Sequence, residues 1–174
     1  LPMDRVLAGI ELATQDLSDE GGPAAAEAIM TTDTVPKTAE YHSPHHWAIG
    51  GMAKGAGMLA PALATMLVVI TTDAVVAADE LASALTTATS FTFDRTDSDG
   101  CMSTNDTVML LASGASGEAA DPEEFTEALT GVCHSLAMQL LADSEGSSHD
   151  IEVTVAGAAS EADALAVARA IARS

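Results

Sequence analysis

Basic residues are scarce in this sequence of 174 residues. Six lysines and arginines stand against 26 aspartates and glutamates, which gives a formal net charge of −20. Binding to nucleic acid or to an anionic membrane depends on clustered lysine and arginine. The two lysines, Lys37 and Lys54, lie in the first third of the sequence and form no such cluster. Neither nucleic acid nor a membrane is therefore expected as a partner.

Aromatic residues and cysteines are also few. Aromatic side chains make up 3% of the chain and hydrophobic residues 48%, which predicts a folded domain with a core of Ala, Val, Leu, Ile and Met. Two cysteines, Cys101 and Cys133, are too few for the disulfide framework of a small secreted protein. We therefore expect reduced thiols at core positions in a cytoplasmic protein.

The sequence lacks the pattern of a signal peptide or a membrane span. Its first residues, Leu1 to Arg5, form neither the basic nor the apolar region of a signal peptide. Because the chain does not begin with Met, we interpret it as a fragment or a processed product. Residues 55–72 carry no charge, but glycine, proline and threonine interrupt them. Their dense apolar part, 66–70, predicts a buried strand rather than a membrane span.

Apolar periodicity and turn residues predict alternating helices and strands. Helices are expected at residues 4–17, 24–30, 79–88, 121–142 and 160–173. Strands are expected within 37–49, with an interruption near Ser43, and at 66–70, 107–111 and 151–155. A glycine-rich loop is expected at 50–57. This order of elements predicts a layered α/β or α+β arrangement without an interior domain boundary.

The glycine-rich segment 50–57 carries one positive charge, Lys54. A phosphate-binding loop of the Walker type requires Gly-Lys followed by Ser or Thr, whereas Gly55 follows Lys54, so nucleotide binding is disfavoured. A tight connection between elements would explain the glycines but not the lone cation. In a chain this acidic, a lysine between glycines is suited to hold a carboxylate.

Thr65 precedes the apolar run 66–70 and has two interpretations. The simpler one is a β-branched residue at the start of a strand. The other is self-cleavage of the Ala64–Thr65 bond, in which the threonine hydroxyl attacks the preceding carbonyl and water cuts the resulting ester. The new α-amino group can then act as the base for its own hydroxyl, a known way to activate this weak nucleophile.

No metal site and no cofactor are predicted. His42, His45 and His46 lie around Ser43-Pro44, which is typical of a surface loop rather than of the rigid frame that a zinc site needs.

Four motifs, in the same order, resemble those of the glutamate N-acetyltransferase/ornithine acetyltransferase family of arginine biosynthesis. They are Ala28-Ile29-Met30-Thr31-Thr32-Asp33-Thr34-Val35-Pro36-Lys37, the segment from Gly51 to Met58 with Ala64-Thr65-Met66-Leu67 and Thr71-Thr72-Asp73-Ala74, then Ser103-Thr104-Asn105-Asp106-Thr107-Val108, and Asp143-Ser144-Glu145-Gly146. The resemblance implies an α+β fold, layered as an α/β/β/α sandwich as in the ornithine acetyltransferase and β-aminopeptidase group, and incomplete in this chain.

Members of this family cut themselves into an α and a β part. The resemblance implies that residues 1–64 end the α part, with Ala64 at the cleavage site, and that residues 65–174 begin the β part with Thr65 as the nucleophile. Thr65 would take the acetyl group from N-acetylornithine and pass it to glutamate, with acetyl-CoA left open as a further donor. Substrate contacts carry over to Thr32, Lys54, Thr65 and Glu145, although Thr31 matches the first position equally well.

The resemblance also has departures and gaps. Ala62-Leu63 replaces the Asn-Met that often follows the proline, and His149 stands where a lysine is common. The oxyanion-hole Thr-Gly pair and further substrate contacts of the family fall outside residues 1–174, so this chain alone is expected to be inactive. The resemblance further implies a heterotetramer of two α and two β parts, or a larger assembly. A related amide hydrolase and a non-catalytic module that kept the fold are the alternatives.

Overall fold

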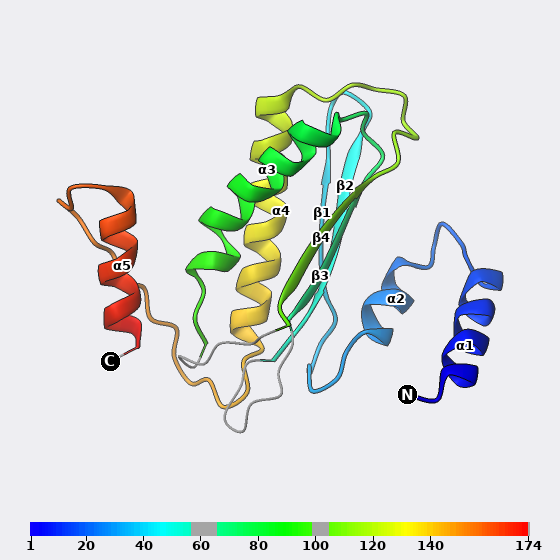
Figure 1. Cartoon of the computed structure of the whole chain (residues 1–174), viewed down its shortest axis with the longest axis horizontal. Helices are drawn as coiled ribbons and strands as arrows, with labels where there is room; N and C mark the ends of the chain where they lie inside the picture. The colour runs from blue at the N-terminus through cyan, green and yellow to red at the C-terminus, as the bar shows by residue number, and fades with distance from the viewer. Residues whose placement is uncertain (57–65, 99–104, 174) are drawn as a thin grey trace.

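A four-stranded sheet in the order β1-β2-β3-β4 forms the centre of the computed structural model (Figure 1). The structure describes residues 1–56, 66–98 and 105–173. Strands β1, β2 and β3 pair antiparallel, and β3 pairs with β4 in parallel. The strands span Lys37–His42 (β1), Ala48–Lys54 (β2), Leu67–Thr72 (β3) and Thr107–Ala112 (β4).

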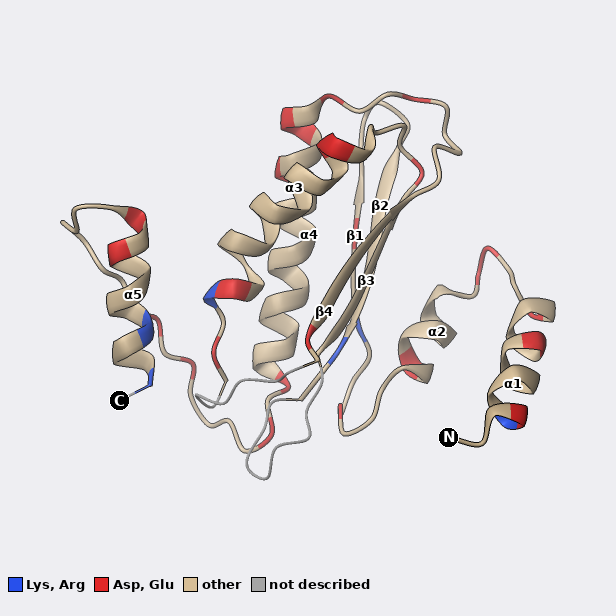
Figure 2. Ribbon diagram, viewed as in Figure 1, with Lys and Arg blue, Asp and Glu red and all other residues tan. Residues whose placement is uncertain are grey.

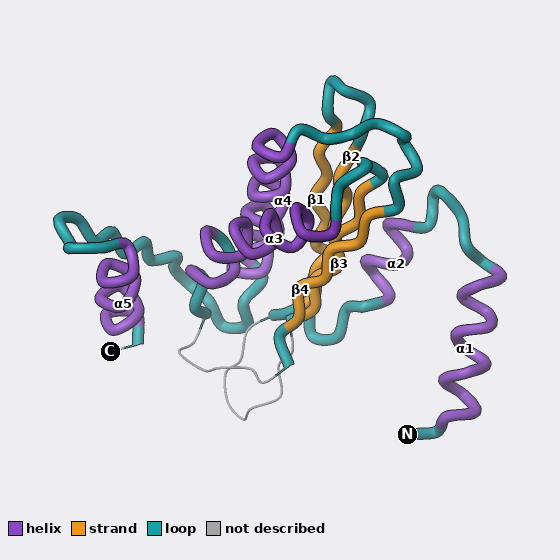
Figure 3. The backbone as a smooth tube through the Cα atoms, turned by 45° about the horizontal axis from the view of Figure 1, so that its top comes forward, coloured by secondary structure: helices purple, strands orange, loops and turns teal. Residues whose placement is uncertain are grey.

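Two helices, α3 (Ala78–Phe91) and α4 (Pro122–Ala142), cover one face of the sheet, and Figure 3 shows them together on that side. The start of α4 follows from its sequence, because the Asp121 side chain accepts hydrogen bonds from the backbone N–H groups of Glu123 and Glu124. Alternate residues of the strands point at these helices. The core that results contains Ile49, Val68, Ile70, Leu129, Val132 and Leu136.

Glycines 50 and 51 lie within β2, so the predicted glycine-rich loop at 50–57 is wrong for its first five residues. The reason lies in packing against α4. A Cβ atom on Gly51 would come within 3.0 Å of Leu136 Cδ1 and 3.4 Å of Val132 Cγ1. Gly51 therefore lets the helix approach the sheet closely, and the glycine marks a contact rather than a loop.

Aromatic side chains contribute more to the core than the composition predicts. Trp47, Phe93 and Phe125 are all buried. Trp47 packs between Tyr41 and Phe125, with ring centroids 5.6 and 5.7 Å apart. The aliphatic core is therefore closed by an aromatic group at the end of the β1–β2 hairpin.

Three further helices lie outside this central layer: α1 (Met3–Gln15), α2 (Gly22–Ala28) and α5 (Glu161–Ala172). Helix α2 contacts β2 and buries Ala26. Helices α1 and α5 bury no residue, and Figure 1 shows them at opposite sides of the molecule. The amphipathic helix predicted at the N-terminus is confirmed, with Leu7 and Ile10 both 59% exposed.

The predicted α+β class is confirmed, and so are the helices near residues 4–17, 24–30, 79–88, 121–142 and 160–173. The strand predicted at 151–155 is wrong, because the segment pairs with no strand in the described residues and Ile151 is 84% exposed. The sheet face turned away from α3 and α4 carries the exposed residues Leu67, Met109 and Leu111. None of the helices in the described ranges is long and apolar enough to cross a membrane.

Candidate active site

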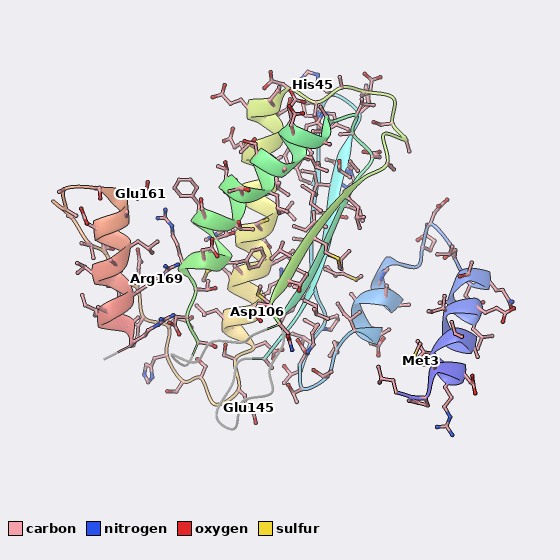
Figure 4. All side chains as sticks on the ribbon, viewed as in Figure 1. Met3, His45, Asp106, Glu145, Glu161 and Arg169 are labelled. Carbon is pink, nitrogen blue, oxygen red and sulfur yellow. The ribbon has the colours of Figure 1, made fainter. Side chains whose placement is uncertain are left out.

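Three segments distant in the sequence meet at one end of the sheet. They are the loop before β1, the end of β2 with the two residues that follow it, and the turn after α4. Figure 2 shows the lysine-containing ends of β1 and β2 in blue at this end of the sheet, and Figure 4 places Glu145 and Asp106 there too. Thr32, Lys54 and Glu145, three residues predicted from the sequence to bind substrate, lie one on each segment.

Asp33 joins the first two segments. Its Oδ1 accepts hydrogen bonds from the Gly55 backbone N–H at 2.6 Å and from Lys37 Nζ at 2.7 Å. Its Oδ2 accepts one from the Thr31 backbone N–H at 3.1 Å. Burial favours the neutral acid, but these three donors outweigh it and lower the pKa of Asp33 from 3.8 to about 2. Asp33 therefore stays ionised at neutral pH although its side chain is fully buried.

Lys37 lies at the centre of the site, with a side chain that is 0% exposed. Its ammonium group contacts Oδ1 of Asp33 at 2.7 Å, Oδ2 of Asp143 at 2.5 Å and the Val35 carbonyl oxygen at 3.4 Å. An ammonium group has three N–H donors, so each has an acceptor within reach. The two carboxylates compensate the buried positive charge, as a buried ion requires, and leave one negative charge in excess. Backbone N–H groups of Gly55, Thr31 and Thr34 donate hydrogen bonds to these carboxylates.

Asp143 joins the third segment to the first. Oδ2 of Asp143 accepts a hydrogen bond from the Thr34 backbone N–H at 2.9 Å, and Oδ1 accepts one from the Thr34 hydroxyl. Asp143 caps the C-terminal end of α4, where the helix dipole disfavours a negative charge. Burial also favours the neutral acid, but Lys37 and Thr34 more than compensate and lower the pKa of Asp143.

Glu145 is attached to the end of β2 through the backbone. Its N–H donates a 2.5 Å hydrogen bond to the carbonyl oxygen of Ala56, and Ala56 is buried. The Glu145 side chain is exposed, and Gly146 follows with a φ of 75°, a conformation in which glycine is favoured. The turn therefore holds a carboxylate at the surface beside the Lys54-Gly55-Ala56 segment.

Lys54 is the last residue of β2 rather than a loop residue, and it lies opposite Leu67 in the register. The Lys54 residue is 7% exposed. Gly55 then turns the chain with a φ of 149°, and a Cβ atom there would come within 3.2 Å of Leu140 Cδ2. The glycine after the lysine is explained by its positive φ and by the close approach of Leu140, and its N–H also donates to Asp33.

Thr32 lies between Thr31 and Asp33 and is exposed, as is Thr31. The Thr31 N–H is engaged by Asp33, which fixes the backbone on both sides of Thr32. This geometry leaves the choice between Thr31 and Thr32 as the substrate contact open.

Thr65 and Ala64 lie outside the described residues, but the residue after them does not. The Met66 backbone N–H donates a 2.9 Å hydrogen bond to Oδ1 of Asp106. The Thr107 N–H in turn donates a 2.9 Å hydrogen bond to the Met66 carbonyl oxygen. Met66, which lies between Thr65 and the start of β3, is thus attached to the start of β4 and to Asp106 of the third motif.

The cysteines and the histidines considered as metal ligands from the sequence lie away from this site, where the structure describes them. Cys133 is fully buried in the core, as predicted, and burial raises the pKa of its thiol to about 12. Cys101 lies outside the described residues. Nε2 of His42 lies 3.7 Å from Glu40 Oε2, and Nε2 of His45 lies 3.8 Å from Glu124 Oε2. Across the residues that the structure describes, no group of His, Cys, Asp or Glu has an arrangement that could hold a metal ion.

Sequence reasoning missed Asp33, Lys37, Asp143 and Asp106 as individual site residues, although all four fall within the quoted motifs. Lys37 and Asp143 are 106 positions apart in the sequence, so local spacing carries no signal for their ion pair. One usable signal was that lysine is rare in this chain. A second was Asp143 at the end of a predicted helix, where a carboxylate is unfavourable unless a cation compensates it.

Comparison with known proteins gives one consistent result. The model of a family described as the ArgJ family matches residues 1–174. A curated protein of Streptomyces avermitilis, named arginine biosynthesis bifunctional protein ArgJ, is 61% identical over 173 residues, which cover 99% of this chain and 45% of that protein. Proteins with the same name from Bifidobacterium longum and Mycolicibacterium paratuberculosis are each 56% identical and are covered over 45% and 43% of their length. The chain thus spans just under half the length of these relatives.

Proposed function

Because this chain belongs to the ArgJ family, we propose that the protein of which it forms part transfers an acetyl group from N2-acetyl-L-ornithine to L-glutamate in arginine biosynthesis. The relatives are named as bifunctional proteins of arginine biosynthesis. The observation that carries the proposal is the meeting of the segments with Thr32, Lys54 and Glu145. Two contacts hold them together: Gly55 N–H to Asp33 and Glu145 N–H to the Ala56 carbonyl.

The first step is self-cleavage. The hydroxyl of Thr65 attacks the carbonyl carbon of Ala64, and the peptide becomes an ester with a free α-amino group on Thr65. Water then hydrolyses the ester, which leaves Ala64 with a carboxylate and Thr65 as a new N-terminus. An unperturbed α-amino group has a pKa of about 7.7–8.0, so a useful fraction is neutral near pH 7 and can accept the hydroxyl proton.

Acetyl transfer then runs in two half-reactions. Thr65 attacks the acetyl carbonyl of N-acetylornithine, its proton passes through the α-amino group to the leaving nitrogen, and ornithine departs. The acetyl-threonine ester remains. The amino group of glutamate attacks this ester, N-acetylglutamate leaves, and the hydroxyl regains its proton. A shared intermediate of this kind produces ping-pong kinetics.

Lys54 and Glu145 divide the recognition of the amino-acid substrates by charge. The ammonium of Lys54 pairs with a substrate carboxylate, and the carboxylate of Glu145 pairs with the side-chain ammonium of ornithine. Thr32, or Thr31 beside it, contributes a hydroxyl. The buried position of Lys54 supports this assignment, because a cation shielded from water attracts a carboxylate more strongly than an exposed one.

Partners and assembly follow from the same proposal. Residues 1–64 belong to the α part and residues 65–174 to the β part, which stay together and associate into a heterotetramer or larger particle in the cytoplasm. The exposed sheet face with Leu67, Met109 and Leu111 is the surface on which the rest of a full-length chain completes the layered sandwich. Metals and cofactors have no part in the proposed chemistry.

The test uses a chain completed to the length of its relatives and supplied with N-acetylornithine and glutamate. The proposal predicts equal amounts of ornithine and N-acetylglutamate, and a radiolabelled acetyl group that is trapped on the β part when glutamate is omitted. Release of free acetate without N-acetylglutamate would instead indicate a related hydrolase. A folded protein that does neither would be a non-catalytic module, and either result would overturn the proposal.

A further inference from the structure

We propose that Asp33, Lys37 and Asp143 are positioning residues that fix Thr32, Lys54 and Glu145 relative to one another. The inference rests on the proposed function and names a set of residues on which its substrate site depends. None of the three is predicted to touch the substrate.

The cluster connects the three segments at positions within two residues of Thr32, Lys54 and Glu145. Asp33 is the neighbour of Thr32 and accepts a hydrogen bond from Gly55, the neighbour of Lys54. Asp143 lies two residues before Glu145. Lys37 bridges the two carboxylates, at 2.7 Å from Asp33 and 2.5 Å from Asp143.

Compared with apolar side chains of the same volume, a buried ion cluster adds little net stability but allows fewer arrangements of the segments that carry it. Burying two carboxylates and one ammonium removes their hydration, and the ion pairs largely offset that loss without a large net gain. The side chains of Lys37 and Asp33 are 0% exposed and that of Asp143 is 7% exposed, so little solvent is available to replace a lost partner. A cluster of this kind is satisfied in one arrangement of the three segments and leaves charges unpaired in any other.

A second contact links the cluster to Glu145 independently of the charges. The Glu145 N–H donates to the Ala56 carbonyl at 2.5 Å, one residue from the Gly55 N–H that donates to Asp33. The end of β2 is thus held from both sides, by Asp33 and by the Glu145 turn. A shift of Asp143, two residues before Glu145, therefore strains the contact that holds Glu145 beside the end of β2.

Asp143→Asn tests the inference, because it keeps the shape of the side chain and removes the charge that Lys37 needs. The variant is made in a chain completed to the length of its relatives. We expect KM for N-acetylornithine to rise about tenfold or more, because Glu145 and Lys54 would be displaced from their substrate contacts. The value of kcat should change less. Glu124→Gln is the matched control. Glu124 lies at the other end of α4 and accepts a hydrogen bond from the distant Ser43 at 2.8 Å, and its substitution should leave KM unchanged.

Thr34 provides a milder pair of variants should Asp143→Asn fail to fold. Its exposed hydroxyl donates to Asp143 Oδ1, so Thr34→Val removes one contact of the cluster and Thr34→Ser restores it. We expect a higher KM for Thr34→Val and a normal KM for Thr34→Ser. If both Thr34 variants and any folded Asp143→Asn protein keep the wild-type KM and lose only melting temperature, the cluster is merely structural and the inference is wrong.

Different results would overturn the proposed function and the role of the cluster. Absence of acetyl transfer in the wild-type protein would overturn the proposed function, and the inference with it. An active wild type whose variants keep their KM would overturn the inference alone.

Discussion

The backbone N–H of Met66 donates a 2.9 Å hydrogen bond to Oδ1 of Asp106. The nitrogen of this contact belongs to the peptide bond that joins Thr65 to Met66. The Thr107 N–H donates to the carbonyl oxygen of the same Met66, so the first residue after the proposed nucleophile is held on both its peptide groups. The backbone directly after Thr65 is therefore fixed at Met66.

Asp106→Ala removes the acceptor and leaves the Met66 N–H to water. We expect self-cleavage to slow about tenfold or more, because the hydroxyl and the Ala64 carbonyl depend on a fixed neighbouring peptide. The conservative variant Asp106→Asn retains an oxygen acceptor and should cleave at nearly the normal rate. Densitometry of precursor and fragments over time provides the rates, and equal rates for Asp106→Ala and wild type would contradict the role of Asp106.

Acid should weaken the folded state through the buried carboxylates. The pKa of Asp33 is about 2 in the folded protein, against 3.8 for an aspartate without these partners. The pKa of Asp143 is also lowered. A carboxyl group with a lowered pKa stabilises the folded state above its unfolded pKa, and this contribution disappears as pH falls from about 4 to 2. For Asp33 it amounts to about 2 kcal/mol of unfolding free energy.

Denaturant unfolding of the completed chain at pH 7 and near pH 2 measures this effect. The Asp33→Asn variant has no carboxyl group to titrate at this position and should lose the contribution of Asp33 to the pH dependence. The difference in unfolding free energy between the two pH values should therefore shrink by about 2 kcal/mol. A variant that shows the same difference as wild type would mean that Asp33 is not a low-pKa carboxylate in the folded protein.

Two adjacent glycines of β2 provide a test of the packing against α4. A Cβ atom on Gly51 would lie 3.0 Å from Leu136 Cδ1, whereas one on Gly50 would have no atom within 4 Å. Gly51→Ala should therefore reduce the unfolding free energy by about 1–3 kcal/mol, as overpacking does. Gly50→Ala should be neutral or slightly stabilising, since alanine restricts the unfolded chain. Equal effects at both positions in thermal unfolding would show that the close approach of Leu136 is not a constraint.

The sequence was sufficient for elements whose signals are local. The helix predicted at 121–142 is α4, Pro122–Ala142, because Asp121 caps it and an apolar face follows. The predicted strands at 66–70 and 107–111 correspond to β3 and β4, since continuous apolar runs of that length suit strands. Strand β3 buries alternate residues as predicted, whereas β4 buries none of its own.

The sequence was insufficient where neighbours distant in the chain decide the structure. In the sequence alone, Gly51 indicates a loop, and only the position of Leu136 against it in the structure explains a glycine within a strand. Residues 151–155 alternate like a strand but have no partner strand in the part of the chain that the structure describes. The Lys37 cluster depends on Asp143, 106 positions away, and no local pattern encodes that pairing.

The central claim is that the chain cuts itself between Ala64 and Thr65. The direct measurement is the intact mass of the chain completed to the length of its relatives, together with a Thr65→Ala variant purified in the same way. The account predicts two wild-type fragments whose masses meet at Ala64 and Thr65, and one uncut, inactive polypeptide for Thr65→Ala. A folded wild-type protein that remains in one piece, or a Thr65→Ala protein that still exchanges acetyl groups at the normal rate, would contradict it.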